Sequence, residues 1–530
     1  MKNTFSPIFL FIALALLLTS CLTPQNPETN SANVLAVQHN YSPPQFEDPE
    51  RILKITRALE EVQDIYRETA EKNHLPGVVY GLVVEDSLVS SGGFGVNNLD
   101  SGEAANEHSL FRIASMSKSF TAMAILKLRD EGRLSLADPV SDHLPALARL
   151  EYPTADARPI SIFNLLTMTA GFPEDNPWGD RFLDISSEIL MEQVSEGIPF
   201  STVPSRHYEY SNLGYGLLGQ IISGVSGTPY QEYIRKNILD PLGMDHTYWE
   251  YSEAPEKRLA LGYRRDGDGW KAEPMLHDGA FGAMGGLITS IADFSKYVSL
   301  HLSAYPPRNE SDTGPLKRSS LREMHRMNLP RFYNNTARFG NSDQIMRGYG
   351  FGLVAMKDQQ GLIEVGHNGG LPGFGSSYMF YPEYGIGIMA FSNLTYVGGT
   401  VQSANYRVIQ SLMDQDLFQA RKLSVSPILM QRKEELAQML MHWDPALEED
   451  IVAANLYLDR SRESRMQEAR ELLSRIGEVS SVGPVVPENQ LRGSFFIQGS
   501  QAKLEVYFTL SPEAEPRVQW ISLDFIPPEE

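Results

Sequence analysis

The chain has 530 residues, of which 42% are hydrophobic, and its formal net charge is −21 at pH 7. This length exceeds one ordinary domain and allows substantial hydrophobic cores, while the acidic excess argues against nucleic acid or an anionic membrane surface as a binding partner. The 11 histidines form no His-Glu-x-x-His pattern, and the single cysteine cannot belong to a cysteine-rich zinc site, so the sequence indicates no metal and no other cofactor.

The first segment is typical of a bacterial lipoprotein leader. Residues 1–2 supply a positive charge, and the apolar run from Ile8 to Leu18 is too short for a comfortable transmembrane helix. The run closes on a lipobox-like sequence ending at Cys21, so we expect a signal peptide over residues 1–20 and a lipidated Cys21. Acyl chains would then hold the protein at a membrane of the cell envelope, on the periplasmic face and at the outer membrane in a Gram-negative host. The alternative is an ordinary cleaved signal with an incidental cysteine.

Residues 21–51 read as a flexible tether. They are rich in Pro, Asn, Gln and Ser and show no apolar periodicity. Such a chain spans on the order of 30 Å root-mean-square, which is enough to hold a domain off the membrane.

A serine with its own base is predicted at the start of a helix. Two short strands, Val78–Val84 and Leu88–Phe94, precede a helical pattern from Ala114 to Leu128. Ser115 and Lys118 share one face of that helix, so the amine can reach the hydroxyl. Serine needs an adjacent base near neutral pH, and lysine serves only if burial or neighbouring cations lower its pKa. The Gly-x-Ser-x-Gly nucleophile signature is absent from the sequence.

Two further motifs follow along the chain. Residues 210–212, Tyr-Ser-Asn, stand in a loop before a helical pattern, where a packed tyrosine and a helix-capping asparagine are the plain structural alternative. Residues 367–369, His-Asn-Gly, fall on a predicted strand edge, since Leu362–Gly366 and Ser377–Tyr381 read as strands and Gly385–Ser392 as a fifth. The long stretch between the first two strands and these three carries helical patterns.

In this order the three motifs resemble those of the β-lactamase and penicillin-binding-protein superfamily. The nearest branch is that of class C β-lactamases, D-Ala-D-Ala carboxypeptidases, D-aminopeptidases and related esterases. The likeness runs from about residue 52 to residue 415 and includes Leu165–Pro173, Leu239–Met244, Gly285–Leu287 and Pro372–Gly375. It implies an α/β (α+β) fold with a mainly antiparallel sheet, flanking helices and an all-helical half, the site lying between the halves.

The resemblance also implies roles for the motif residues. Tyr210 would be a second acid/base group, as a phenolate or as a hydrogen-bond relay that passes the serine proton to the leaving group. Asn212 would orient the lysine and donate to the substrate amide. Gly369 and Gly370 let the substrate approach closely, and the N–H of Gly370 would join that of Ser115 in an oxyanion hole.

One motif position departs from this family pattern. Penicillin-recognising relatives usually carry lysine where His367 stands, and histidine titrates near neutrality, so binding of an anionic substrate should be weaker and more pH-sensitive. This departure favours a peptidase or esterase over a true β-lactamase, although a satisfied surface histidine is also possible. The stretch Asp175–Arg181 reads as an insertion near the site, where Trp178 either lines a substrate pocket or is a plain loop tryptophan.

The resemblance stops after about residue 415, and a different module is predicted over residues 425–530. Pro427–Trp443, Ile451–Leu458 and Arg465–Ile476 show helical periodicity, and alternating strands follow. Helices followed by strands indicate an α+β module, faintly similar to the NTF2-like group. No catalytic constellation is visible in it, so we expect a role in packing, dimerisation or substrate gating.

The sequence therefore predicts a lipid-anchored serine hydrolase of the cell envelope that acts through a Ser115 acyl-enzyme. A β-lactam, a D-amino-acid peptide and a short ester all pass through that intermediate, and pocket shape decides among them. The alternative is a non-catalytic envelope protein that keeps the fold to bind β-lactams or peptidoglycan fragments. The intact motifs argue against it, because a pure binder needs no lysine of lowered pKa beside a serine.

Overall fold

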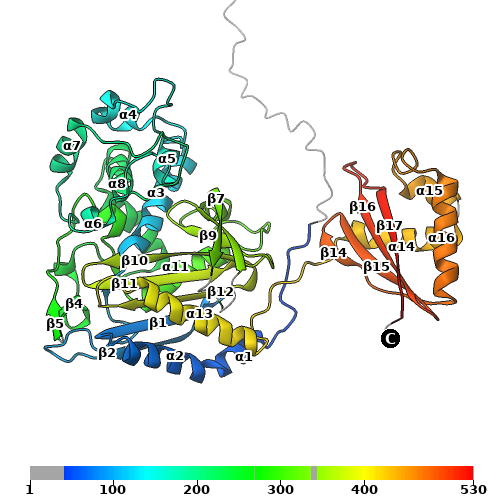
Figure 1. Cartoon of the computed structure of the whole chain (residues 1–530), viewed down its shortest axis with the longest axis horizontal. Helices are drawn as coiled ribbons and strands as arrows, with labels where there is room; N and C mark the ends of the chain where they lie inside the picture. The colour runs from blue at the N-terminus through cyan, green and yellow to red at the C-terminus, as the bar shows by residue number, and fades with distance from the viewer. Residues whose placement is uncertain (1–40, 268, 336–338, 340–342, 444, 529–530) are drawn as a thin grey trace, which may run out of the picture. The chain divides into compact units, whose positions relative to one another are not determined.

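The computed structural model describes residues 41–528 apart from positions 268, 336–338, 340–342 and 444 (Figure 1). The predicted signal peptide, the lipidation site Cys21 and most of the predicted tether lie outside the described residues. The described part of the chain divides into two compact units, Pro43–Lys422 and a second one that contains residues 423–528. Within the described part, no helix has both the length and the apolar character needed to cross a bilayer.

The larger unit contains an antiparallel sheet of eight strands in the order β2-β1-β12-β11-β10-β9-β8-β7. The strands span β1 Gly77–Val84, β2 Ser87–Gly95, β7 Asn328–Asn335, β8 Asp343–Tyr349, β9 Val354–Lys357, β10 Ile363–Leu371, β11 Phe374–Tyr381 and β12 Ile386–Ser392. The five strands predicted from the sequence are confirmed. The stretch between β2 and β10 carries the predicted helices, and it also contains strands β7 to β9, which the sequence pattern did not indicate.

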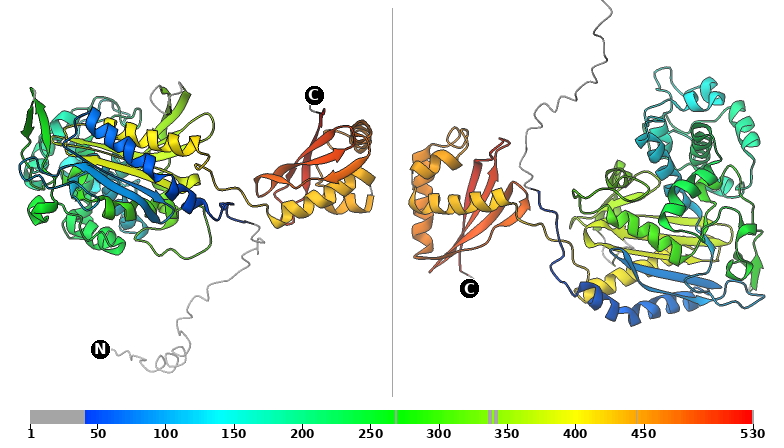
Figure 2. Two further views of the ribbon diagram at one scale, coloured as in Figure 1. Left: turned by 90° about the horizontal axis from the view of Figure 1, so that it is seen from below. Right: turned by 180° about the vertical axis from the view of Figure 1, so that it is seen from behind.

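Helices cover both faces of this sheet (Figure 2). Successive side chains of a strand point to opposite faces. In β1, Val79 and Val83 therefore join the core that includes α11 (Ile291–Ser303), whereas Val78 and the other alternate residues face α2 (Leu59–Lys72) and α13 (Gly398–Asp414). Burial on both faces explains why β1 reads as a continuous apolar run.

The helical half of the unit packs around α8. Its glycines allow close approach, because a Cβ at Gly219 would lie 2.7 Å from the Cβ of Ala283 on α10. The remaining helices of this unit are α1 Arg51–Arg57, α3 Lys118–Asp130, α4 Val140–His143, α5 Ile162–Leu166, α6 Asn176–Gly179, α7 Ser187–Glu196, α8 Asn212–Ser226, α9 Tyr230–Ile234, α10 Gly282–Gly285 and α12 Arg318–Met324. Two small ribbons pair β3 (Phe111–Arg112) with β6 (Ile288–Thr289), and β4 (Tyr263–Asp266) with β5 (Gly269–Ala272).

The last part of the predicted tether packs with this unit. Gln45 and Lys422 exchange two backbone hydrogen bonds of 2.9 and 2.8 Å. The guanidinium of Arg51 lies 3.9 Å from the ring centroid of Phe46. The ordered part therefore begins earlier than the sequence pattern predicts.

The second unit has the helices-then-strands order predicted for it. Helices α14 (Pro427–His442), α15 (Pro445–Ile451) and α16 (Arg462–Ile476) precede an antiparallel sheet of β13 Val479–Val482, β14 Val486–Asn489, β15 Arg492–Gly499, β16 Lys503–Leu510 and β17 Val518–Ile526. Side chains of β15 and β16 alternate between buried and more exposed positions, as expected for a sheet with one covered face. The NTF2-like resemblance stays a prediction.

One predicted helix of this unit is wrong. The sequence pattern places a helix over Ile451–Leu458, but α15 ends at Ile451. Val452 forms an isolated bridge with Val518 of β17, and the N–H of Ala453 donates to the Val518 carbonyl at 3.0 Å. Leu456 is buried in the core of this unit, whereas Leu458 is 81% exposed, so a continuous apolar helix face does not form after Ile451.

Candidate active site

Ser115 lies in a 3₁₀ turn, η1 (Ala114–Ser117), that runs directly into α3. In a 3₁₀ turn the side chains of residues i and i+3 eclipse each other. The Nζ of Lys118 consequently donates to the Oγ of Ser115 at 3.0 Å. The structure thus brings together the two side chains that the sequence pairs as nucleophile and base.

The turn is fixed by the sheet behind it. The N–H of Ile113 donates to the Leu287 carbonyl at 3.0 Å, and the Oγ of Ser376 donates to the Ile113 carbonyl at 2.8 Å. Ala114 adopts a φ of +49°, which is uncommon for a residue with a Cβ and is held by these contacts. A Cβ at Gly369 would lie 2.3 Å from the same Ile113 carbonyl oxygen. Only glycine lets β10 approach the nucleophile turn this closely.

Lys118 is completely buried and is surrounded by acceptors. Besides Ser115, its Nζ donates to the Oδ1 of Asn212 at 2.7 Å and to the carbonyl of Met284 at 2.9 Å. Burial lowers the pKa of Lys118 to about 7, against an opposing effect of the Asp180 and Asp175 charges. A substantial fraction of the amine is therefore neutral near pH 7 and able to accept a proton.

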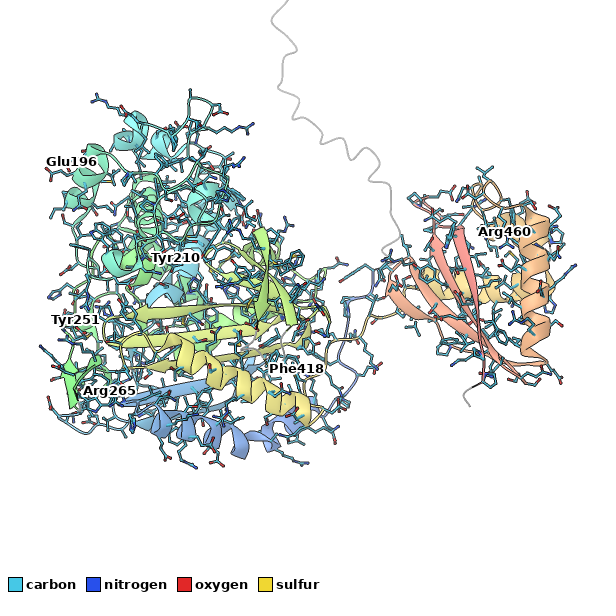
Figure 3. The ribbon with its side chains drawn as sticks, in the orientation of Figure 1. Glu196, Tyr210, Tyr251, Arg265, Phe418 and Arg460 are labelled. Atoms are coloured by element: carbon cyan, nitrogen blue, oxygen red, sulfur yellow. The ribbon has the colours of Figure 1, made fainter. Side chains whose placement is uncertain are left out.

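Tyr210 stands at the junction of the helical half and the sheet (Figure 3). Its ring centroid lies 4.9 Å from the Nζ of Lys118. Burial raises the pKa of Tyr210 well above its usual value, although the neighbouring Ser115 hydroxyl opposes the rise. Of the two roles left open by the sequence, a protonated relay fits this environment and a phenolate does not.

Asn212 is held in place by Asp175 and Asn176, two residues of the insertion Asp175–Arg181 for which the sequence predicted no role. Asp175 accepts the N–H of Asn212 at 2.6 Å through Oδ1 and that of Leu213 at 2.8 Å through Oδ2, so it caps the start of α8. The Oδ1 of Asn176 accepts from the Nδ2 of Asn212 at 3.1 Å. This bond leaves the Asn212 oxygen facing Lys118.

The insertion Asp175–Arg181 does lie at the site, but its aromatic residue does not line the cavity at the nucleophile. Trp178 is 43% exposed and packs against Phe182 and Phe281. The stretch contributes Asp180 instead, which is 3% exposed and accepts from the hydroxyl of Tyr396 at 3.1 Å. Burial raises the pKa of Asp180 to about 6, and the Lys118 charge opposes that rise.

The charge of Asp180 predicts a measurable effect on the base. Because this carboxylate raises the pKa of Lys118, Asp180→Asn should lower that pKa. Acylation needs the neutral amine, so the acidic limb of the pH profile for Ser115 acylation should move to lower pH. The profile is measured with a neutral ester, and Asp156→Asn, on an exposed loop, is the matched control. A limb that stays in place or moves to higher pH would contradict the assigned coupling.

His367 is buried, which corrects the expectation that it titrates near neutrality. Its Nε2 lies 3.1 Å from the hydroxyl of Tyr349, and its Nδ1 lies 2.5 Å from the carbonyl of Asn368. Burial, and next the charge of Lys118, lower the pKa of His367 to about 3. The ring is neutral around pH 7, so it cannot supply a charge for a substrate carboxylate there.

These residues surround a cavity of about 390 Å³ at the nucleophile. Ser115, Tyr210, His367, Gly369 and Gly370 line it, together with Asn176, Asp180, Asn368, Tyr396, Gly398 and Gly399. Strand β9 pairs with β10 only over residues 363–366 of β10. From position 367 onward, β10 is therefore an edge strand on the side of β9, as predicted. Ser115 lies in the first turn of a helix, where backbone N–H groups lack partners within the helix. An oxyanion hole at Ser115 and Gly370 is compatible with this placement and stays a prediction.

The residues described by the structure contain no group of three or more His, Cys, Asp or Glu side chains that could hold a metal ion.

Comparison with known sequences gives a family match over most of the larger unit. The model described as Beta-lactamase matches residues 62–412. Protein flp of Staphylococcus aureus (strain N315) is 29% identical over 388 residues, covering 71% of this chain and 70% of that protein. The D-alanyl-D-alanine-carboxypeptidase/endopeptidase AmpH of Escherichia coli (strain K12) is 28% identical over 288 residues, covering 53% of this chain and 69% of its own length.

Solved structures with the same fold include an octameric penicillin-binding protein homologue from Pyrococcus abyssi. It aligns with a TM-score of 0.54 at 21% identity and covers 88% of this chain and 98% of its own. A class C beta lactamase from Rhodobacter sphaeroides aligns with a TM-score of 0.53 at 19% identity, covering 66% and 99%. At these identities the likeness shows the fold alone.

Proposed function

The chain belongs to the β-lactamase family, and on this premise we propose that it is a serine hydrolase that cleaves an amide or ester through a Ser115 acyl-enzyme. The observation that carries the proposal is the position of Lys118. A fully buried amine with a pKa of about 7, 3.0 Å from a serine hydroxyl, is the base that such a nucleophile needs.

The proposed reaction begins when the Oγ of Ser115 attacks the carbonyl carbon and its proton passes to the Nζ of Lys118. The oxyanion of the tetrahedral intermediate faces the N–H groups of Ser115 and Gly370. Collapse breaks the bond to the leaving group, which takes up the proton of Lys118 through the Tyr210 hydroxyl, so that Lys118 is neutral again. Water then attacks the ester of Ser115 and loses its proton through the Tyr210 hydroxyl to Lys118, and the acid product departs as Lys118 returns that proton to the Oγ of Ser115.

A panel of substrates tests this proposal and narrows the bond that is cleaved. The purified protein is treated with a fluorophosphonate probe and assayed with nitrocefin, a D-Ala-D-Ala peptide, a D-amino-acid amide and a p-nitrophenyl ester. We expect covalent labelling of Ser115 and turnover of at least one member. His367 is neutral, so it does not itself supply a cation for the carboxylate that nitrocefin and the D-Ala-D-Ala peptide both carry. No label, or a label on another serine, would overturn the proposal.

We also propose that the protein is anchored to the cell envelope through Cys21. The short apolar run and the lipobox-like sequence before the cysteine support this. Metabolic labelling with a palmitate analogue in a bacterial host should tag the wild-type chain and leave Cys21→Ser untagged and released from the membrane fraction. A wild-type chain that is soluble and untagged would refute the anchor.

A further inference from the structure

Two arginines stand directly opposite each other on the β7–β8 hairpin. The register of the hairpin pairs Arg331 with Arg347. Like charges at opposed positions of an antiparallel pair are unfavourable. A hairpin that carries such a pair gains from a counter-charge placed between the two side chains.

The described part of the chain supplies no such counter-charge through an ion pair. Both side chains are exposed. The guanidinium of Arg347 lies 5.9 Å from the ring centroid of Tyr333, and the Nη2 of Arg331 lies 3.3 Å from the Nδ1 of His207. Two carboxylates share a cavity with these arginines: Glu174, whose Oε1 accepts the N–H of Asn176 at 3.0 Å, lines a cavity with both, and the buried Glu364 lines another with Arg347.

Both arginines line a cavity of about 300 Å³ beside the nucleophile. Its wall also includes the aromatic residues Tyr208, Tyr210 and Tyr333, with Glu174 as its one carboxylate among the described residues. Two guanidinium charges and one carboxylate leave a single positive charge. This lining suits one carboxylate, which a guanidinium binds with two parallel hydrogen bonds.

Tyr210 joins this cavity to the nucleophile. Tyr210 lines both the cavity at Ser115 and the cavity of about 300 Å³ that contains Arg331 and Arg347. It also lines a third cavity, of about 420 Å³, whose wall includes Arg347 and His367. In the proposed reaction Tyr210 returns the proton to the leaving group. A leaving group that takes its proton from Tyr210 is therefore adjacent to a residue that also lines the cavity of Arg331 and Arg347.

We propose that Arg331 and Arg347 form the anion-recognition site of this chain and select substrates whose leaving group carries a carboxylate. This inference rests on the proposed function. It assigns the recognition of charge to the β7–β8 hairpin and not to His367, which stands at the motif position where relatives carry lysine.

The test uses two esters with the same acyl group and leaving groups of opposite type, 3-carboxyphenyl acetate with an anionic leaving group and its methyl carboxylate ester with a neutral one, each kcat/KM being divided by the rate constant of its uncatalysed hydrolysis. For wild type, kcat/KM should favour the anionic ester, and the preference should shrink as salt rises. Arg347→Gln should lower the ratio of the two kcat/KM values by about 10-fold, and the double variant with Arg331→Gln should lower it further. Arg158→Gln makes the same charge change on an exposed loop outside these cavities and should leave the ratio unchanged.

The charge reversal Arg347→Glu sharpens the test, because it should turn the preference toward the neutral ester. A wild type without preference, or a double variant that keeps the wild-type ratio, would overturn the inference while Ser115 chemistry stands. Failure of the proposed function looks different: neither ester would be hydrolysed and Ser115 would take no fluorophosphonate label.

Discussion

Ser115→Ala should abolish hydrolysis of every substrate that the wild type turns over, lowering kcat/KM by on the order of 10⁴-fold or more. The alanine has no oxygen to form the acyl-enzyme, and no other side chain in the cavity combines a hydroxyl with a buried amine 3.0 Å away. The measurement is steady-state turnover of the most reactive ester, made beside thermal unfolding. Lys118 keeps its bonds to Asn212 and Met284, so the variant should fold.

Ser187→Ala is the matched control, because Ser187 is an exposed residue on α7 away from the cavity. It should retain wild-type turnover. If Ser115→Ala retained a tenth or more of the wild-type kcat/KM while folded, Ser115 could not be the nucleophile.

Lys118→Met should slow acylation by about 10³-fold while preserving much of the buried volume. The thioether cannot accept the Ser115 proton. Lys118→Arg should fail similarly, since a guanidinium stays protonated at working pH. Single-turnover acylation measured by stopped flow separates this step from deacylation. Acylation at the wild-type rate in the methionine variant would exclude lysine as the base.

Lys127→Met is the control on the same helix, where the lysine is partly exposed and pairs with Glu131. It should acylate at the wild-type rate. In the wild type, acylation should accelerate as pH rises toward and through about 7, because the neutral amine becomes the main form above its pKa.

The sequence could predict the parts of the site that depend on local spacing. Ser115 and Lys118 are three residues apart, and in the helical turn that joins them this spacing brings the amine to the hydroxyl. Tyr210 and His367 lie near Ser115 and Lys118 because of the tertiary fold. In the sequence, only the resemblance to a family indicated that these four residues form one site. The five predicted strands could also be located from the sequence, because their apolar residues are continuous or alternate with polar ones.

The missed residues act through remote partners. Asp175 caps α8 from 37 positions earlier in the chain, and its place before the short helix α6 does not reveal this role. The insertion between the first two motifs is the one sequence feature that could have indicated these residues. The predicted substrate-lining residue of that insertion was Trp178, and not the acidic residues beside it. His367 is neutral because Tyr349 and the surrounding core bury it. The residues next to His367 in the sequence do not predict this burial.

Strands β7 and β8 were missed because few of their side chains are buried: Ile345 and Tyr349 are the buried ones among those that the structure describes. Phe332 of β7 is 72% exposed, and the residues around it are polar or charged. Such a ribbon forms by pairing with its neighbours and shows no apolar alternation. The same hairpin carries the arginines of the proposed anion site.

The most direct test of the central claim is the mass of the protein quenched during turnover of p-nitrophenyl acetate. The proposed mechanism predicts a species heavier than the free protein by one acetyl group, and peptide mapping should place that group on Ser115. Tyr210→Phe, which weakens the proton relay needed for deacylation, should accumulate more of it. Sustained turnover with no adduct in either protein, or an acetyl group on a residue other than Ser115, would contradict the acyl-enzyme mechanism.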